Sequence, residues 1–182
     1  MKHLKFGKFT TVYKGKIFTI KHQDVTLPSG KKTYYEFAER ESSINILALN
    51  EKNELLMTRE YRYGYKQPVW FIPAGRLDNK NESPRAAAQR ELREETGYRA
   101  KTLKFLKKNS ASDVLFWDIY LFAAKNLVID PLPKDETEEI KNVFVPMKKA
   151  VQMALDGTVK NEYIAYSILH FDYLLKSKKI KW

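Results

Sequence analysis

The first part of the chain alternates apolar and polar positions in the way that extended strands do. Its strand-like runs are residues 9–13, 16–20, 24–27 and 32–38. Pro28, Ser29 and Gly30 place a turn between the last two runs, so residues 24–38 are predicted to form a hairpin. So few strands need another surface to pack on. The pattern therefore predicts an N-terminal β-segment over residues 1–42, followed by a larger second part.

The second part mixes strands with helices. Apolar runs predict strands at residues 43–49, 54–59, 101–106, 115–123 and 141–145. We expect the first two of these strands to pair across a turn at residues 50–53. Apolar residues at helical spacing predict two helices near the end of the chain, at residues 148–155 and 163–176. Because 182 residues suffice for one domain with a small appendage, residues 43–182 are predicted to be that domain.

A third helix is predicted from Pro84 to Thr96, between the two sets of strands. Ser83 is a good N-cap residue, and proline suits the first helical position. Good helix formers follow, and Gly97 fits the left-handed position just past a helix end. The start and stop signals therefore agree on a helix of three to four turns.

Three carboxylates share one face of this helix. At about 100° per residue, Glu91, Glu94 and Glu95 lie within an arc of roughly 100°. They repel one another, and they stand near the helix C-terminus, where the helix dipole disfavours negative charge. A bound cation would compensate both penalties, and hard oxygen ligands without nearby Cys or His suit Mg²⁺ or Mn²⁺. The alternative is a solvated acidic face with Arg90 and Arg93 as local partners.

The residues around this helix resemble the Nudix box of the Nudix hydrolase superfamily. That box reads Gly, five residues, Glu, seven residues, and then Arg-Glu-apolar-x-Glu-Glu-x-Gly-apolar. Here Glu82 is followed by seven residues and then by residues 90–98, RELREETGY, which match throughout. The departure is one extra residue between Gly75 and Glu82. Together with the strand and helix pattern, the resemblance implies an α+β fold in α/β/α layers around a mixed sheet, with an N-terminal antiparallel β-segment.

The resemblance also implies site residues on and beside the helix. Glu91 and Glu95 would hold Mg²⁺, with Mn²⁺ as a possible substitute, and Glu94 would assist in catalysis. The backbone carbonyl of Ala74, just before the box glycine, is a further candidate metal ligand. Arg90 is expected to brace Glu82 or a catalytic carboxylate rather than to touch substrate.

Two other stretches resemble segments of ADP-ribose and nucleoside-diphosphate-sugar pyrophosphatases that act on substrate. In Arg-Glu-Tyr-Arg, the resemblance assigns Arg62, and after it Arg59, to phosphate binding, and Tyr61 to stacking on a base. In the acidic loop before residue 140, Glu136 and Glu138 are both candidates for the glutamate that activates water. The alternatives are a half-buried strand face for the tyrosines and a solvated loop for the glutamates.

Charge and composition refine this hypothesis. The chain has 33 Lys and Arg against 22 Asp and Glu, a net charge of +11, which suits an anionic substrate near acidic metal ligands. The alternatives are lysines that serve solubility, which we favour for the C-terminal lysines, and nucleic-acid binding. There is no cysteine, hence no thiol chemistry, and no apolar run of membrane-spanning length or secretory type, so we expect a cytoplasmic protein without membrane contact.

The sequence thus predicts a Mg²⁺-dependent enzyme that splits the diphosphate of ADP-ribose or a related nucleotide sugar into a nucleoside monophosphate and a sugar phosphate. Ser110-Ala111-Ser112 stands where close ADP-ribose pyrophosphatases often carry Ser-Pro-Gly, so the sugar stays open. The resembling enzymes pair through their N-terminal β-segment, which implies a homodimer. The alternatives are hydrolysis of RNA 5′ ends or dinucleoside polyphosphates, and a non-catalytic nucleotide- or nucleic-acid-binding protein on the same fold.

Overall fold

The computed structural model describes residues 3–77, 81–133, 140–180 and 182. The chain forms two compact units, each of which draws on two segments of the sequence. The first unit consists of Met1–Ser43 and Lys108–Ile119, and the second of Ile44–Lys107 and Tyr120–Trp182. The N-terminal unit therefore contains, besides the β-segment expected over residues 1–42, a piece of chain that follows the box helix.

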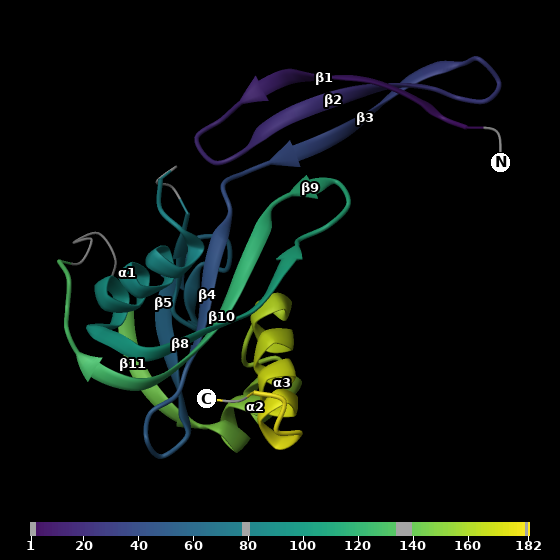
Figure 1. Cartoon of the computed structure of the whole chain (residues 1–182). Helices are drawn as coiled ribbons and strands as arrows, with labels where there is room; N and C mark the ends of the chain where they lie inside the picture. The colour runs from purple at the N-terminus through teal and green to yellow at the C-terminus, as the bar shows by residue number, and fades with distance from the viewer. Residues whose placement is uncertain (1–2, 78–80, 134–139, 181) are drawn as a thin grey trace. The chain divides into compact units, whose positions relative to one another are not determined.

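The first unit is a sheet of three antiparallel strands extended by one short parallel strand (Figure 1). Its order is β1 (Lys5–Lys14), β2 (Thr19–Thr26), β3 (Lys32–Glu39) and β9 (Leu115–Phe116). Gly30, with a φ of 86°, closes the β2–β3 turn through a hydrogen bond from its N–H to the Leu27 carbonyl. The predicted hairpin over residues 24–38 is therefore confirmed.

In the described residues of the second unit, two sheets lie between helices. One has the order β7 (Ala74–Arg76), β4 (Ser43–Ala48), β10 (Asp118–Ile129), β8 (Tyr98–Ser110), and the other β11 (Ile140–Pro146), β5 (Glu54–Arg62), β6 (Gln67–Phe71). The expected pairing of residues 43–49 with 54–59 is wrong, because β4 and β5 belong to different sheets and only Leu49 and Leu55 form a bridge. The predicted turn at residues 50–53 does connect the two strands, but the strands diverge on either side of it.

The helices are α1 (Pro84–Thr96), α2 (Met147–Leu155) and α3 (Glu162–Lys176), at the positions that the sequence predicts. At the start of α1, the Ser83 side chain accepts a hydrogen bond from the Ala86 N–H at 3.2 Å. At its end, Gly97 has a φ of 77° and its N–H bonds to the Arg93 carbonyl at 3.0 Å. None of the helices in the described part of the chain is long and apolar enough to span a membrane.

Opposite faces of the strands belong to two different cores. One core joins alternate residues of β4 and β10 to the inner face of α1, as with Ile46 and Leu92. The other joins the remaining residues of these strands to α2 and α3, as with Leu47, Ile168 and Phe171. Figure 1 shows α1 on one side of these strands and α2 and α3 on the other. The α/β/α layering expected from the sequence is confirmed.

Candidate active site

The carboxylate edge of α1, the side of the helix that carries Glu91, Glu94 and Glu95, is hydrogen-bonded to β7. This short strand contains the box glycine and ends at Arg76. The N–H of Ala74 donates to Oε2 of Glu95 at 2.9 Å. Two residues on, Arg90 donates from Nη2 to the Arg76 carbonyl at 3.1 Å. The strand and the helix are therefore tied at both ends of the contact, and the candidate metal ligands Ala74 and Glu95 are brought together.

Gly75 lies between these two ties because the Glu91 carboxylate occupies the space that a side chain would need. A Cβ built on Gly75 would stand 1.7 Å from the carboxyl carbon of Glu91. The carboxyl group is the far end of a flexible side chain, so a larger residue here would displace Glu91 rather than the backbone. The glycine of the box is thus required for the position of a carboxylate.

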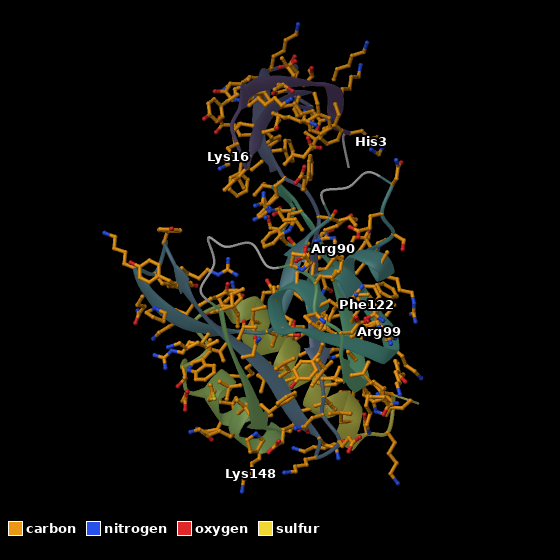
Figure 2. All side chains as sticks on the ribbon, turned by 90° about the vertical axis from the view of Figure 1, so that its left-hand side faces the viewer. His3, Lys16, Arg90, Arg99, Phe122 and Lys148 are labelled. Atoms are coloured by element: carbon orange, nitrogen blue, oxygen red, sulfur yellow. The ribbon has the colours of Figure 1, made fainter. Side chains whose placement is uncertain are left out.

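Arg90 binds three glutamates at once, and Figure 2 marks its place on α1. Its Nε and Nη2 donate to Glu82 at 3.1 and 3.0 Å, and its Nη1 donates to Glu91 at 2.8 Å and to Glu94 at 2.9 Å. The hydrogen bond to Glu82 is the main cause of the raised pKa of Arg90. The expected contact of Arg90 with Glu82 is confirmed, and the extra residue after Gly75 does not prevent it.

Burial makes the charge on Glu91 costly. The side chain is only 12% exposed, and this burial raises the pKa of Glu91 above its usual value, although Arg90 acts in the opposite direction. Glu94 is more open, at 31%. A nearby cation would stabilise the ionised form of a buried carboxylate whose pKa is raised.

The donor atoms at this edge fit a hard divalent cation. Glu91, Glu94, Glu95 and the Ala74 carbonyl supply oxygens only, the ligands that Mg²⁺ and Mn²⁺ prefer. Within the part of the chain that the structure describes, no three Asp, Glu, His or Cys side chains are arranged so that they could hold a metal ion. Arg90, bonded to both Glu91 and Glu94, instead supplies positive charge to these two carboxylates. The chemistry of these donor atoms therefore fits a hard divalent cation.

The candidate substrate ligands on β5 lie on opposite faces of the strand. Successive strand residues point to alternate faces. Leu56 belongs to the core under α1, so Arg62 projects on the α1 side, whereas Leu55 belongs to the core under α2 and α3, so Arg59 and Tyr61 project on that other side. Only Arg62 of the three therefore shares a side with the carboxylates.

Arg62 is held in place by an acid and a ring. Its Nη2 donates to Oε1 of Glu60 at 2.9 Å, and its guanidinium lies 4.6 Å from the centroid of the Phe71 ring. Glu60 is 9% exposed, so the pair is anchored in the strand. By contrast, Arg59 lies over the Trp70 ring at 5.5 Å, and Tyr61 is 54% exposed.

A polar group that the sequence did not single out lies next to Thr58 of β5 and the last turn of α1. Asn142 of β11 pairs with Thr58 of β5, and its Nδ2 donates to the Glu95 carbonyl at 3.0 Å. The oxygen of this side chain, Oδ1, and the hydroxyl of Thr58 are buried without a hydrogen-bond partner among the described residues. The sequence signal that could have identified Asn142 is that polar residues occupy inward positions of two paired strands. In the structure, Asn142 fixes the backbone of Glu95, a candidate metal ligand.

A cluster of charges fixes the far end of α1 to the end of β10. Arg93 donates to the carbonyl and the carboxylate of Asp130 at 2.9 and 3.0 Å, and Arg99 donates to the same carboxylate at 2.7 Å. The bond from Arg99, followed by the charge of Arg93, lowers the pKa of Asp130. The N–H of Asp130 also bonds to the Gly97 carbonyl at 2.9 Å.

The predicted catalytic glutamates Glu136 and Glu138 lie outside the described residues. The described chain on both sides of them is attached to α1. The Leu132 N–H lies 3.4 Å from the Arg93 carbonyl, and Asn142 bonds to the Glu95 carbonyl. The described residues Leu132 and Asn142 are therefore both hydrogen-bonded to the last turn of α1.

The Ser110-Ala111-Ser112 stretch belongs to the first unit and forms local bonds. Ser112 Oγ accepts from the N–H groups of Val114 and Leu115 at 3.2 and 3.1 Å, while Ser110 Oγ donates to Asp118 at 3.2 Å. These contacts define a turn before β9.

Comparison with known proteins shows which family the chain resembles. The model of the NUDIX domain matches residues 39–166. The chain is 29% identical over 163 residues to the ADP-ribose pyrophosphatase of Bacillus subtilis, covering 86% of each protein. It is 27% identical over 177 residues to the methanol dehydrogenase activator of Bacillus methanolicus, covering 96% of this chain and 94% of that protein. A crystal structure of an ADP compounds hydrolase matches with a TM-score of 0.84 at 25% identity, covering 96% and 95% of the two chains.

The chain therefore belongs to the NUDIX family, and the fold it shares with the solved hydrolase is the one that the box predicts. The enzyme class expected from the box, a Nudix pyrophosphatase, is confirmed as well.

Proposed function

We propose that this Nudix pyrophosphatase hydrolyses the diphosphate linkage of a nucleoside diphosphate sugar, ADP-ribose or a close relative, to a nucleoside monophosphate and a sugar phosphate. The observation that carries the proposal is the carboxylate edge of α1, which is hydrogen-bonded to β7 and lies on the face of β5 from which Arg62 projects. Relatives along nearly the whole chain, named ADP-ribose pyrophosphatase and ADP compounds hydrolase, support the substrate class.

In this proposal Glu91, Glu95 and the Ala74 carbonyl hold Mg²⁺ or Mn²⁺, and Glu94 assists them. When bound, the cation would neutralise charge on the diphosphate and lower the pKa of a nearby water. Arg90 keeps Glu91 and Glu94 in place through its three ion pairs and does not touch substrate.

Arg62 grips a phosphate of the substrate, because its guanidinium lies on the α1 side and Glu60 holds its orientation. Arg59 and Tyr61, which the sequence also assigned to substrate contact, project from the other face of β5, and this favours Arg62 over them. Glu136 or Glu138 takes the proton from the attacking water, which is the role that the sequence predicts for one of them. The cytoplasmic location also remains a prediction.

We also propose a homodimer that forms through the N-terminal unit. Phe9, Phe37 and Phe116 form a cluster with ring centroids 5.0–5.8 Å apart, and Phe9 and Phe116 are 46% and 38% exposed. Contiguous exposed aromatic surface of this kind is typical of a protein interface. Sedimentation equilibrium would give the mass of a dimer for the intact chain and a lower mass for Phe9→Lys.

Metal-dependent turnover tests the function directly. Purified protein is assayed with Mg²⁺, with Mn²⁺ and with EDTA on ADP-ribose, other nucleotide sugars, dinucleoside polyphosphates and RNA with a 5′ triphosphate. We expect rapid metal-dependent cleavage of one or a few diphosphate sugars. Preferential cleavage of RNA or dinucleoside polyphosphates would replace the proposed substrate class, and binding without cleavage would replace the enzyme by a binding protein.

A further inference from the structure

The outward face of α3 carries aromatic side chains that the hydrophobic core does not use. Tyr166, His170 and Tyr173 follow one another at four- and three-residue spacing, which puts them on one stripe of the helix. Tyr166 and Tyr173 are 51% and 53% exposed, whereas Ile168 and Phe171 are fully buried. About half of each of these two tyrosines is therefore open to solvent.

Two lysines from different parts of the chain are placed against these tyrosines. Lys107 of β8 has its Nζ 4.5 Å from the centroid of the Tyr166 ring and 3.3 Å from the Tyr166 hydroxyl. Lys179, just beyond α3, has its Nζ 4.8 Å from the centroid of the Tyr173 ring and 2.8 Å from the Tyr173 hydroxyl. Each ring thus orients an ammonium group, so the lysines are held in place before any ligand arrives.

The local potential on this stripe is positive. The His170 ring stacks on Tyr166 with a centroid distance of 5.8 Å and an interplanar angle of 9°. Burial lowers the pKa of His170, and the charges of Lys107 and Lys179 lower it further. On the same helix Asp172 forms an ion pair with Lys176 at 2.7 Å, so its charge is compensated there.

The two lysine–tyrosine pairs are spaced along the helix axis. Seven residues separate Tyr166 from Tyr173, which corresponds to a rise of about 10 Å. Consecutive phosphates of a stacked strand are about 3.4 Å apart along its axis, so the two pairs would span roughly three nucleotides. Alternating aromatic rings and cations of this kind are how proteins bind single-stranded nucleic acid without reading its sequence.

We propose that Tyr166, His170, Tyr173, Lys107 and Lys179, which we call the α3 tyrosine face, bind single-stranded nucleic acid. The phosphates lie against the two lysines and the bases against exposed ring surface. The net charge of +11 attracts the strand from a distance. An acidic protein surface would use the lysines but gain little from flat rings, so the aromatic stripe favours the nucleic acid. The proposal does not depend on the substrate of the enzyme.

Fluorescence anisotropy of a labelled single-stranded RNA of about a dozen nucleotides tests the proposal on the full-length protein. Lys107→Gln with Lys179→Gln should weaken binding at least about tenfold and reduce the slope of log K against log salt by about 1.4, since each phosphate contact contributes about 0.7. The matched control is Lys148→Gln with Lys149→Gln, which removes the same charge from exposed positions of α2, and Figure 2 shows Lys148.

Variants of one ring separate stacking from charge. Tyr173→Leu should weaken RNA binding severalfold, whereas Tyr173→Phe, which keeps the ring and loses the hydroxyl, should stay close to the wild type. A melting temperature within a few degrees of the wild type shows that the variants fold. Hydrolysis rates should be unchanged in all of them, because none of these residues belongs to the proposed active site.

The histidines report the position of the ligand. The chain has three, of which His22 lies on β2 in the N-terminal unit. In an NMR titration with the RNA, the ring protons of His170 should shift while those of His22 stay in place. Equal weakening by the lysine control pair, competition by polyglutamate as strong as that by unlabelled RNA, or an unshifted His170 would each overturn the proposal.

Discussion

The two faces of β5 carry the same kinds of residues and have different surroundings. On the face toward α2 and α3, Arg59 lies over Trp70 and Tyr61 is open to solvent. On the face toward α1, Arg62 is bonded to Glu60, and Thr58 lies next to an asparagine that bonds to the backbone of Glu95. Both faces offer an arginine, but among the described residues only the face toward α1 adjoins, through Asn142, the helix that carries the carboxylates.

This difference shows what sequence alone could not assign. A motif such as Arg-Glu-Tyr-Arg names two arginines, and strand alternation forces them onto different sides when they are an odd number of residues apart. We therefore expect substitutions on the α1 side of β5, and on α1 itself, to affect catalysis strongly. Substitutions on the other side should be nearly silent.

The largest effect is expected on the helix. Glu95→Gln removes a charged metal-ligand candidate and should lower kcat about 10²–10³-fold, the scale found when one electrostatic contact of a transition state is lost. Steady-state kinetics with Mg²⁺ measure the loss. Glu51→Gln, at an exposed turn, is the control with the same chemical change. Full turnover by Glu95→Gln would remove the metal assignment.

Gly75→Ala should lower kcat almost as much, although the substitution does not remove a charged group. Its new Cβ would collide with the Glu91 carboxyl, which must move away from β7. We expect a loss of kcat of about 10²-fold with a melting temperature within a few degrees of the wild type. If the variant were fully active, the position of Glu91 against Gly75 would be irrelevant to catalysis.

The two arginines of β5 give the sharpest test of the comparison. Arg62→Ala should reduce kcat/KM about 10–100-fold, because a charge-assisted hydrogen bond to substrate contributes about 1.5–3 kcal/mol. Arg59→Ala should stay within about threefold of the wild type, at the level of a surface change. Measured kcat/KM values in the reverse order would mean that substrate approaches from the side of α2 and α3.

Asn142→Ala should have a smaller effect of about tenfold, comparable to the loss of a partner that orients a ligand. The amide fixes the Glu95 carbonyl, so the Mg²⁺ concentration for half-maximal activity should rise, while KM for substrate stays nearly constant. Lys141→Gln, one residue earlier and on the opposite face of β11, is the control. A change in stability alone, with unchanged metal dependence, would assign Asn142 a purely structural role.

The smallest effect concerns stability rather than rate. Arg99 and Arg93 lower the pKa of Asp130 in the folded protein, so its ionised form stabilises the fold above the unfolded pKa of about 3.9. That contribution is lost as pH falls through the lower, folded pKa. The wild type should therefore melt above Asp130→Asn near pH 7, and the two melting temperatures should converge toward pH 3. A difference that does not change with pH would contradict this.

The box helix could be predicted to the residue because all its signals are local. Ser83, Pro84 and Gly97 determine its ends, and the spacing of its glutamates determines the shared face. Features that depend on contacts between distant parts of the chain could not be predicted in this way. The partners of β5 depend on β11, which comes much later in the chain, and the role of Asn142 follows from that pairing. Likewise β9 joins the N-terminal sheet from a segment more than seventy residues away.

The most direct test of the central claim is the fate of ADP-ribose in water enriched in ¹⁸O with Mg²⁺ present. The account predicts AMP and ribose 5-phosphate as the products, with one ¹⁸O atom in a single product phosphate, and product formation about 10²–10³-fold slower with Glu95→Gln. Release of inorganic phosphate, label-free products, or equal cleavage by the variant would contradict the claim that these glutamates serve the hydrolysis of a nucleotide-sugar diphosphate.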